Sequence, residues 1–298
     1  MHKKIDIYPT LLNVAAPFKG ILLDANGVFW DGDEAGLMPN AKETMERLFE
    51  HRKTIGILSN STQLVSKGLE KFKSQGLIEG VHFHFLLTSG EITRQMFLEQ
   101  RLPFKTPKKR FFLFGSVHPK FSSHELIFKD SSYSETKDVK EADFIFISIP
   151  HIDGQDQTKT DLFLEDVKKL KGSNIPMVCA NPDRFAHEGK PSKEVVRQGS
   201  IASMYEEMGG KVFYIGKPSN VIFSKAMNFF YRKKILHPEE ILMVGDTPET
   251  DIRGARSFGM ASALVTTTGI MGKRMQKGMD AISKLPKEDL PDFFIERF

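Results

Sequence analysis

The sequence predicts an α/β protein: a doubly wound, parallel-sheet (Rossmann-like) core with a second α/β domain inserted into it. Short, non-alternating apolar runs, each ending in a polar or glycine-bearing turn, are typical of strands buried on both faces. Amphipathic segments lie between these runs, and strand–helix alternation favours this architecture. The runs occupy 20–27, 54–62, 111–116, 143–150, 176–183, 211–219, 240–248 and 261–269.

Two of the intervening stretches show the helical pattern clearly. In 39–53 the apolar residues fall on one stripe, and Asn40 is predicted to cap the helix. In 219–234 apolar residues again repeat at helical spacing, and Lys and Arg fill the last turn, where they complement the helix dipole.

The chain length of 298 residues suits two domains. Residues 105–210 contain a strand–helix–strand pattern of their own, which predicts an inserted α/β cap between two core segments, 1–104 and 211–298. A closing cap excludes water and carries specificity residues over a site.

Composition limits the function classes. Forty per cent hydrophobic and 27% charged residues are ordinary for a soluble globular protein, and the net charge of +4 is spread along the chain. The densest basic run, 105–110, is either a solvated loop or an anion contact, so we expect no nucleic-acid partner. The N-terminus lacks a signal-peptide core, and no 18 apolar residues run together, so we expect no membrane span. The single cysteine, Cys179, suits a reducing compartment, and we expect a cytoplasmic protein.

Polar residues stand where several apolar runs end: Asp24, Ser59, Asp246, and Lys217 just past its own run. In an open α/β sheet the ligand crevice lies outside the carboxyl ends of the strands, so these side chains are expected at one edge. Each residue taken alone has a structural alternative. Asp24 suits a turn before glycine, and the stretch 59–62 (SNST) suits a helix N-cap.

Two glycine-containing motifs lie in the last third of the chain, at 216–219 and 245–252. The stretch 216–219 (GKPS) is not a nucleotide-binding loop, because the preceding glycine is one residue too far away and Pro218 takes the required Ser/Thr place. In 245–252 (GDTPETDI), Asp246 and Asp251 follow a buried strand at a helix start, which favours function.

The combination is more specific than its parts. An Asp after the first strand, a Ser after the second, a Lys before a helix and then GDxxxxD resembles the haloacid dehalogenase (HAD) superfamily, and most closely its class IIA phosphatase-like hydrolases. Further resemblance lies in GV…DG (27–32), CANPD (179–183) and IGKP (215–218). The likeness covers roughly residues 18 to 272.

The resemblance implies a Mg²⁺ cofactor and an aspartyl-phosphate intermediate. Asp24 would be the nucleophile that attacks phosphorus. The metal would be held by the Asp24 and Asp246 carboxylates and the backbone carbonyl of Asn26, with Asp251 as the fourth metal-site residue, holding a coordinated water or orienting that shell.

The resemblance also implies how the substrate is held. Ser59, Asn60 and nearby backbone amides would bind the phosphoryl oxygens, and Lys217 would neutralise charge on the nucleophile and phosphoryl group. The stretch 181–189 resembles the substrate-specificity loop of the cap, although it also suits a simple turn after a strand. Its residues of interest are Asn181, Asp183, Arg184 and His187.

Asn26 departs from the family pattern, in which a second Asp protonates the leaving alcohol and then activates water. An amide can do neither, and general acid–base help is typically worth about 10²–10⁴-fold. The enzyme is therefore slow or limited to leaving groups that need no proton, or it uses Asp31 or His187 instead, or the site only binds. Asp31 equally suits a role in ordering its loop.

We thus predict a Mg²⁺-dependent phosphatase of a small phosphorylated metabolite, with a non-catalytic relative that binds a phosphorylated ligand or a protein partner as the alternative. Phosphonate or halide cleavage is a third reading, since such relatives also lack the second Asp. Family analogy extends to a homodimer through the cap. His82 and His84 share a predicted strand face, but without a third ligand they favour packing over zinc.

Overall fold

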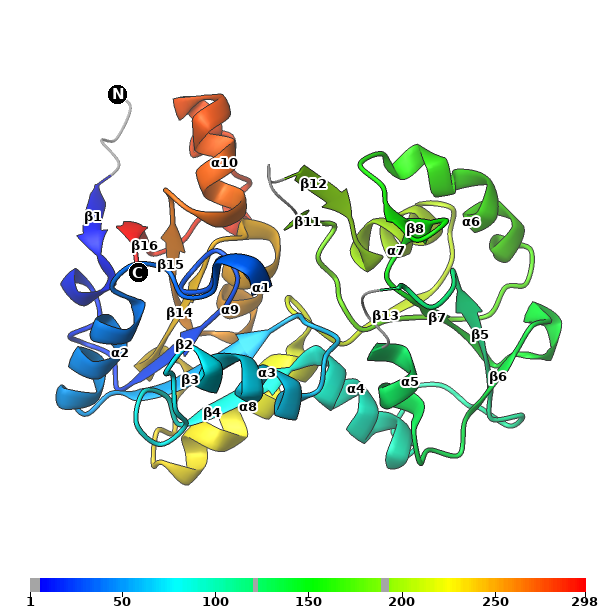
Figure 1. The fold of residues 1–298 in the computed structure, drawn as a ribbon, viewed down its shortest axis with the longest axis horizontal. Helices are drawn as coiled ribbons and strands as arrows, with labels where there is room; N and C mark the ends of the chain where they lie inside the picture. The colour runs from blue at the N-terminus through cyan, green and yellow to red at the C-terminus, as the bar shows by residue number, and fades with distance from the viewer. Residues whose placement is uncertain (1–5, 120–122, 189–192) are drawn as a thin grey trace. The chain divides into compact units, whose positions relative to one another are not determined.

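The computed structural model describes residues 6–119, 123–188 and 193–298, which form two compact units (Figure 1). The second unit consists of 60–64 and 88–216, and the first contains the rest of the chain. The chain crosses between the units four times, and two of these crossings fall directly after Ser59 and directly before Lys217. Residues 88–104 pack with the second unit, and the predicted domain boundaries at 105 and 210 stay a prediction.

The first unit is built on a seven-stranded sheet whose strands pair in parallel from β1 through to β3. The sheet winds outward in both directions from β2, because the chain passes to β3 on one side and later returns to β14 on the other. In spatial order the strands are β1 (Ile7–Thr10), β16 (Phe293–Arg297), β15 (Ala261–Val265), β14 (Ile241–Gly245), β2 (Gly20–Leu23), β3 (Thr54–Ser59) and β4 (Phe85–Thr88).

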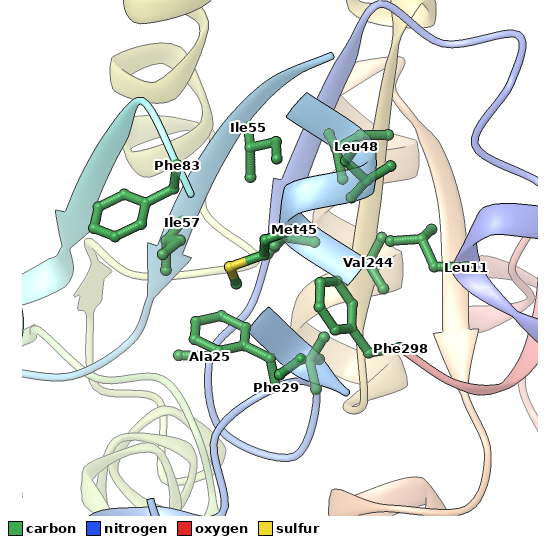
Figure 2. Close-up of a cluster of buried hydrophobic side chains, with 14 of the residues drawn as sticks. Leu11, Ala25, Phe29, Met45, Leu48, Ile55, Ile57, Phe83, Val244 and Phe298 are labelled. Atoms are coloured by element: carbon green, nitrogen blue, oxygen red, sulfur yellow. The ribbon is translucent and has the colours of Figure 1, made fainter. Parts of the chain in front are cut away.

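Helices complete the first unit, and its main core lies between them and the sheet. Figure 2 shows Met45 and Leu48 packed in one cluster with Ile55, Ile57 and Val244. Burying each such side chain contributes about 1.5–3 kcal/mol. The helices are α1 (Gly32–Ala35), α2 (Ala41–Glu50), α3 (Val65–Ser74), α8 (Asn220–Arg232), α9 (Arg253–Phe258) and α10 (Gly269–Lys277), with short turns η1 (Leu11–Asn13), η4 (Pro238–Glu240), η5 (Pro248–Ile252), η6 (Met279–Ala281) and η7 (Lys287–Asp289).

The second unit has its own parallel five-stranded sheet, in the order β13 (Val212–Tyr214), β10 (Met177–Cys179), β7 (Phe144–Ile147), β5 (Arg110–Phe114) and β6 (Ser134–Thr136). Two antiparallel pairs accompany it, β8 (His151–Ile152) with β9 (Gln155–Asp156) and β11 (Phe185–Glu188) with β12 (Lys193–Val196). The helices are α4 (Ser89–Leu98), α5 (Ser123–Phe128), α6 (Leu164–Lys171) and α7 (Gln198–Glu207), with turns η2 (Val139–Glu141) and η3 (Thr160–Phe163).

The predicted fold class is confirmed, with local corrections. Asn40 does stand at the N-cap position of α2, but its backbone is left-handed (φ 63°) and its side chain makes no capping hydrogen bond. His82 and His84 precede β4 and do not share a strand face. The His82 Nδ1 accepts the Ile78 N–H, whereas the His84 Nδ1 accepts the Ile55 N–H. Each ring thus satisfies a different backbone donor.

Candidate active site

The predicted edge of the sheet carries two aspartates at the centre of the winding. Asp24 follows β2 directly, and Asp246 follows β14, its neighbour in the sheet. Ligand sites of doubly wound sheets lie at this position, outside the carboxyl ends of the strands where the winding direction changes. A β-carbon on Gly245 would overlap the side chain of Asp251, so glycine here lets the η5 turn close onto the strand end.

Three buried carboxylates meet at this edge. Asp24, Asp246 and Asp251 each offer one oxygen, and these oxygens lie within 4.8 Å of one another. The ammonium group of Lys217, which is 1% exposed, lies 2.6 Å from the Asp24 Oδ1 and 2.7 Å from the Asp251 Oδ1. Lys217, just before α8, thus places a cation within the carboxylate cluster.

Asp246 is held by the start of α10. Its Oδ2 accepts the Ile270 N–H at 2.6 Å, and its Oδ1 accepts the Thr247 hydroxyl at 3.1 Å. Side chains on Gly27 or Gly269 would overlap this carboxylate, and both glycines have positive φ. Burial, followed by the charges of Asp24 and Asp251, raises the pKa of Asp246 well above its ordinary value.

Asp251 holds neighbouring groups of the site in position. Its Oδ2 accepts the backbone N–H groups of Asp246 (3.1 Å) and Thr247 (3.0 Å), while its Oδ1 faces Lys217. Both oxygens are therefore engaged within the chain. This arrangement fixes the backbone that presents Asp246 and the position of the lysine.

The donor set fits a magnesium ion. When ionised, three carboxylates and one ammonium group carry a formal charge of −2, which a divalent cation would balance. Hard carboxylate and carbonyl oxygens are the ligands that Mg²⁺ prefers in proteins. An uncompensated buried charge of this size is costly, so a bound cation would stabilise the folded site.

Asn26 is exposed among buried neighbours, although it lies only two residues beyond Asp24. The turn is fixed by its backbone, because the Ala25 carbonyl accepts the N–H groups of Val28, Phe29 and Trp30. The Asn26 side chain makes no hydrogen bond to the described part of the chain. Its substitution by other residues is therefore compatible with the same turn.

The other predicted sources of a proton are Asp31 and His187. Asp31 is exposed at the start of α1, where its side chain makes no capping hydrogen bond. His187 lies in β11, and its side chain is outside the described residues.

The predicted phosphate and specificity residues fall into both units. Ser59 ends β3, is buried, and is followed by a non-helical loop, so it does not cap a helix. Asn60 belongs to the second unit, where its Nδ2 donates to the Asp183 Oδ1 at 2.8 Å. Asn181 accepts the Asp183 N–H at 2.9 Å, and Arg184 is exposed.

Sequence reasoning missed the contribution of α10. The run of threonines before Gly269 was the available signal, because a polar stretch followed by glycine after a buried strand marks a helix start at the sheet edge. Here the Thr268 hydroxyl donates to the Gly27 carbonyl at 2.6 Å and ties this helix to the loop after β2.

Two family models match the chain. One is described as haloacid dehalogenase-like hydrolase and matches residues 21–126, and a second, of HAD-hydrolase-like proteins, matches residues 214–293. The chain belongs to the HAD-like hydrolases. These matches cover the segments that carry Asp24, Ser59, Lys217 and Asp246.

Individual HAD relatives resemble nearly the whole chain. Chronophin from Bos taurus is 25% identical over 292 residues, which is 96% of this chain and 93% of chronophin. The sugar-phosphatase AraL of Bacillus subtilis is 26% identical and covers 83% of both chains. A HAD-like hydrolase from Brucella suis 1330 shares the fold, with a TM-score of 0.77 and 21% identity over 98% of this chain and 100% of that one.

Other kinds of site find less support. Among the described residues, the only group of His, Cys, Asp or Glu side chains close enough to hold a metal is the aspartate cluster, which gives no support to zinc at His82 or His84. None of the helices in the described part of the chain combines the length and apolar character needed to cross a bilayer.

Proposed function

We propose that this HAD-like hydrolase is a Mg²⁺-dependent phosphatase of a small phosphorylated metabolite. The observation that carries the proposal is the contact of Lys217 with both Asp24 and Asp251 beside Asp246. A carboxylate nucleophile held by a buried ammonium group suits attack on a phosphoryl group, because the same cation stabilises the negative charge on the phosphoryl oxygens. The name of the relative AraL, a sugar-phosphatase, agrees with this activity.

In the proposed reaction, a carboxylate oxygen of Asp24 attacks phosphorus while the bond to the leaving oxygen breaks. Water then cleaves the aspartyl-phosphate, releasing phosphate and regenerating Asp24. Ser59 and neighbouring backbone amides bind the phosphoryl oxygens, and Lys217 neutralises their charge.

The carboxylates of Asp24 and Asp246 and the backbone carbonyl of Asn26 would hold Mg²⁺, with Asp251 keeping their frame. When bound, the ion supplies charge neutralisation for the transferring phosphoryl group. Replacement of the usual Asp by Asn26 leaves this ligand intact, because the ligand at that position is a main-chain oxygen.

Asn26 restricts the substrates that turn over quickly. An amide cannot give a proton to an alkoxide leaving group or take one from water, and such help is worth about 10²–10⁴-fold. The enzyme is expected to favour leaving groups that are stable without a proton, such as phenolates. The same residue favours the second candidate function, a silent relative that binds a phosphorylated ligand or a protein partner.

The deciding experiment compares an aryl phosphate with alkyl phosphates on the wild type, Asn26→Asp and Asp24→Ala in the presence of Mg²⁺. We expect the wild type to cleave the aryl ester, Asn26→Asp to gain alkyl-phosphate turnover, and Asp24→Ala to be inactive. If all three proteins release phosphate at the same background rate, the phosphatase proposal is wrong and the binding function takes its place.

We also propose a substrate-selecting role for the second unit and a cytoplasmic location for the protein. The loop that contains Asn181, Asp183, Arg184 and His187 would select the substrate as part of a cap. A cytoplasmic location is supported by the single cysteine, Cys179, which is buried and unbridged.

A further inference from the structure

Three separate segments of the second unit meet at Asn60. Its Nδ2 donates to the Asp183 Oδ1 at 2.8 Å, and Asn60 is only 3% exposed. A hydrogen bond to a carboxylate is roughly twice as strong as one between neutral groups. The third segment ends at Gly216, whose backbone packs closely against the other two. A β-carbon on Gly216 would lie 2.5 Å from the Asn60 Oδ1 and 2.6 Å from the Pro182 Cδ.

The loop around Asn60 is also clamped from the other side. The Ser89 hydroxyl, at the start of α4, donates to the carbonyls of Asn60 (2.8 Å) and Ser61 (3.0 Å). A side chain on Gly90 would overlap the Thr62 carbonyl, so the start of α4 packs directly on the loop. These contacts leave the loop little freedom to move independently of the second unit.

Asp183 is fixed within its own loop in a similar way. Its N–H donates to the Asn181 Oδ1 at 2.9 Å, and its carbonyl accepts the Gly199 N–H at 3.1 Å. A β-carbon on Gly199 would overlap the Pro182 carbonyl, which brings the start of α7 against the loop. The Asn60–Asp183 hydrogen bond therefore joins two well-ordered loops.

The residues that meet here, Asn60, Asp183 and Gly216, include direct chain neighbours of two proposed site residues. Asn60 follows Ser59, the proposed phosphate ligand, and Gly216 precedes Lys217, the proposed cation of the site. A shift of the loop at Asp183 would thus be passed through one peptide bond to each of these two residues.

We propose that Asn60 and Asp183 are positioning residues that couple the loop beginning at Asn181 to the alignment of Ser59 and Lys217. The inference rests on the proposed phosphatase function. It gives Asn60 a role other than direct phosphate binding, because its amide is engaged with a carboxylate.

The test uses the full chain with p-nitrophenyl phosphate and Mg²⁺, on Asn60→Ala, Asp183→Ala and the exchanged pair Asn60→Asp/Asp183→Asn. Misplacement of reacting groups by about 1 Å costs up to about 10²-fold, so we expect each alanine variant to lose about 10–100-fold in kcat with little change in KM. The exchanged pair, which restores a donor and a carboxylate acceptor in reverse, should recover at least half of that loss on a logarithmic scale. Asn228→Ala, an exposed asparagine on α8, is the matched control and should match the wild type.

The outcomes separate this inference from the proposed function. Asp24→Ala must be inactive, and if it keeps wild-type turnover the phosphatase function itself fails. If wild-type turnover is too slow to measure, the same series is made in an Asn26→Asp background. If the alanine variants have a lower melting temperature but an unchanged kcat, the positioning role is wrong. A higher KM with an unchanged kcat would contradict it equally. Lack of recovery in a folded exchanged pair would also overturn it.

Discussion

Replacing Lys217 by Met tests the central electrostatic feature of the site. Methionine keeps most of the length of the unbranched side chain but removes the charge that lies 2.6 Å from Asp24 and 2.7 Å from Asp251. At an effective dielectric constant of about 20, each contact is worth about 6 kcal/mol before desolvation. After desolvation, breaking a buried pair costs about 3–5 kcal/mol, and we expect this loss of folding free energy in EDTA.

Magnesium should reduce that loss. Without the lysine the ionised cluster carries a formal charge of −3, and a divalent cation offsets most of it. We expect urea unfolding to give a smaller difference between Lys217→Met and the wild type at saturating Mg²⁺ than in EDTA. Turnover of an aryl phosphate should fall by about 10²–10³-fold even at saturating Mg²⁺, because the preorganised cation is missing from the transition state.

A matched variant and two outcomes decide the point. Lys42→Met removes an exposed lysine from α2 and should leave both stability and turnover unchanged. If Lys217→Met loses the same free energy in EDTA and in Mg²⁺, the lysine and the metal do not share a charge-balancing role. If its turnover equals that of the wild type, Lys217 does not act on the reaction.

Three further predictions concern parts of the first unit. Gly269→Ala, whose new methyl group would overlap Asp246, should weaken the apparent Mg²⁺ affinity in turnover assays by about 10–100-fold, and an unchanged Mg²⁺ dependence would contradict the geometry. Asp289→Asn breaks a two-point ion pair with Arg253 (2.8 Å for both contacts) at a fully buried carboxylate, and should cost about 1.5–3 kcal/mol in urea unfolding; a loss below 0.5 kcal/mol would contradict the prediction. Burial lowers the pKa of His84, so the unfolded chain binds the proton more readily and stability should fall as pH drops below about 6.5. His84→Asn keeps an acceptor for the backbone and should lose less stability than the wild type between pH 7.5 and 5.5.

The elements that sequence reasoning located are those with strong, continuous apolar patterns. The runs ending at Asp24 and Asp246 became neighbouring buried strands, because a strand covered on both faces must be apolar throughout. In the first unit, strands β1, β4 and β16 lie outside the predicted runs. β1 is a largely exposed edge strand, and β16 lies beside it with two exposed residues at its end, so their patterns lack that continuity.

Site residues, too, could be predicted only where they leave a pattern in the sequence. Strand ends and the order of Asp, Lys and paired Asp led to four residues that the structure brings together, namely Asp24, Lys217, Asp246 and Asp251. The role of Ile270 was not accessible, because its backbone N–H reaches Asp246 from 24 positions along the chain and a backbone donor leaves no residue-type signature. Likewise, Asn60 carries a side chain suited to phosphate, and only its contact with Asp183 indicates a different role.

Charge balance favours turnover over simple binding as the role of this site. In a pocket that only captured a phosphorylated ligand, Asp24 would serve only as a partner of Lys217 and a ligand of Mg²⁺, and its own charge would oppose the phosphate. The chain nevertheless buries Asp24 against Lys217 and keeps three glycines, Gly27, Gly245 and Gly269, where side chains would disturb the other carboxylates. Burying these charges costs stability in the absence of a cation. Such a cost is consistent with the proposed bond formation at Asp24, in a site where Asn26 replaces the usual acid–base group.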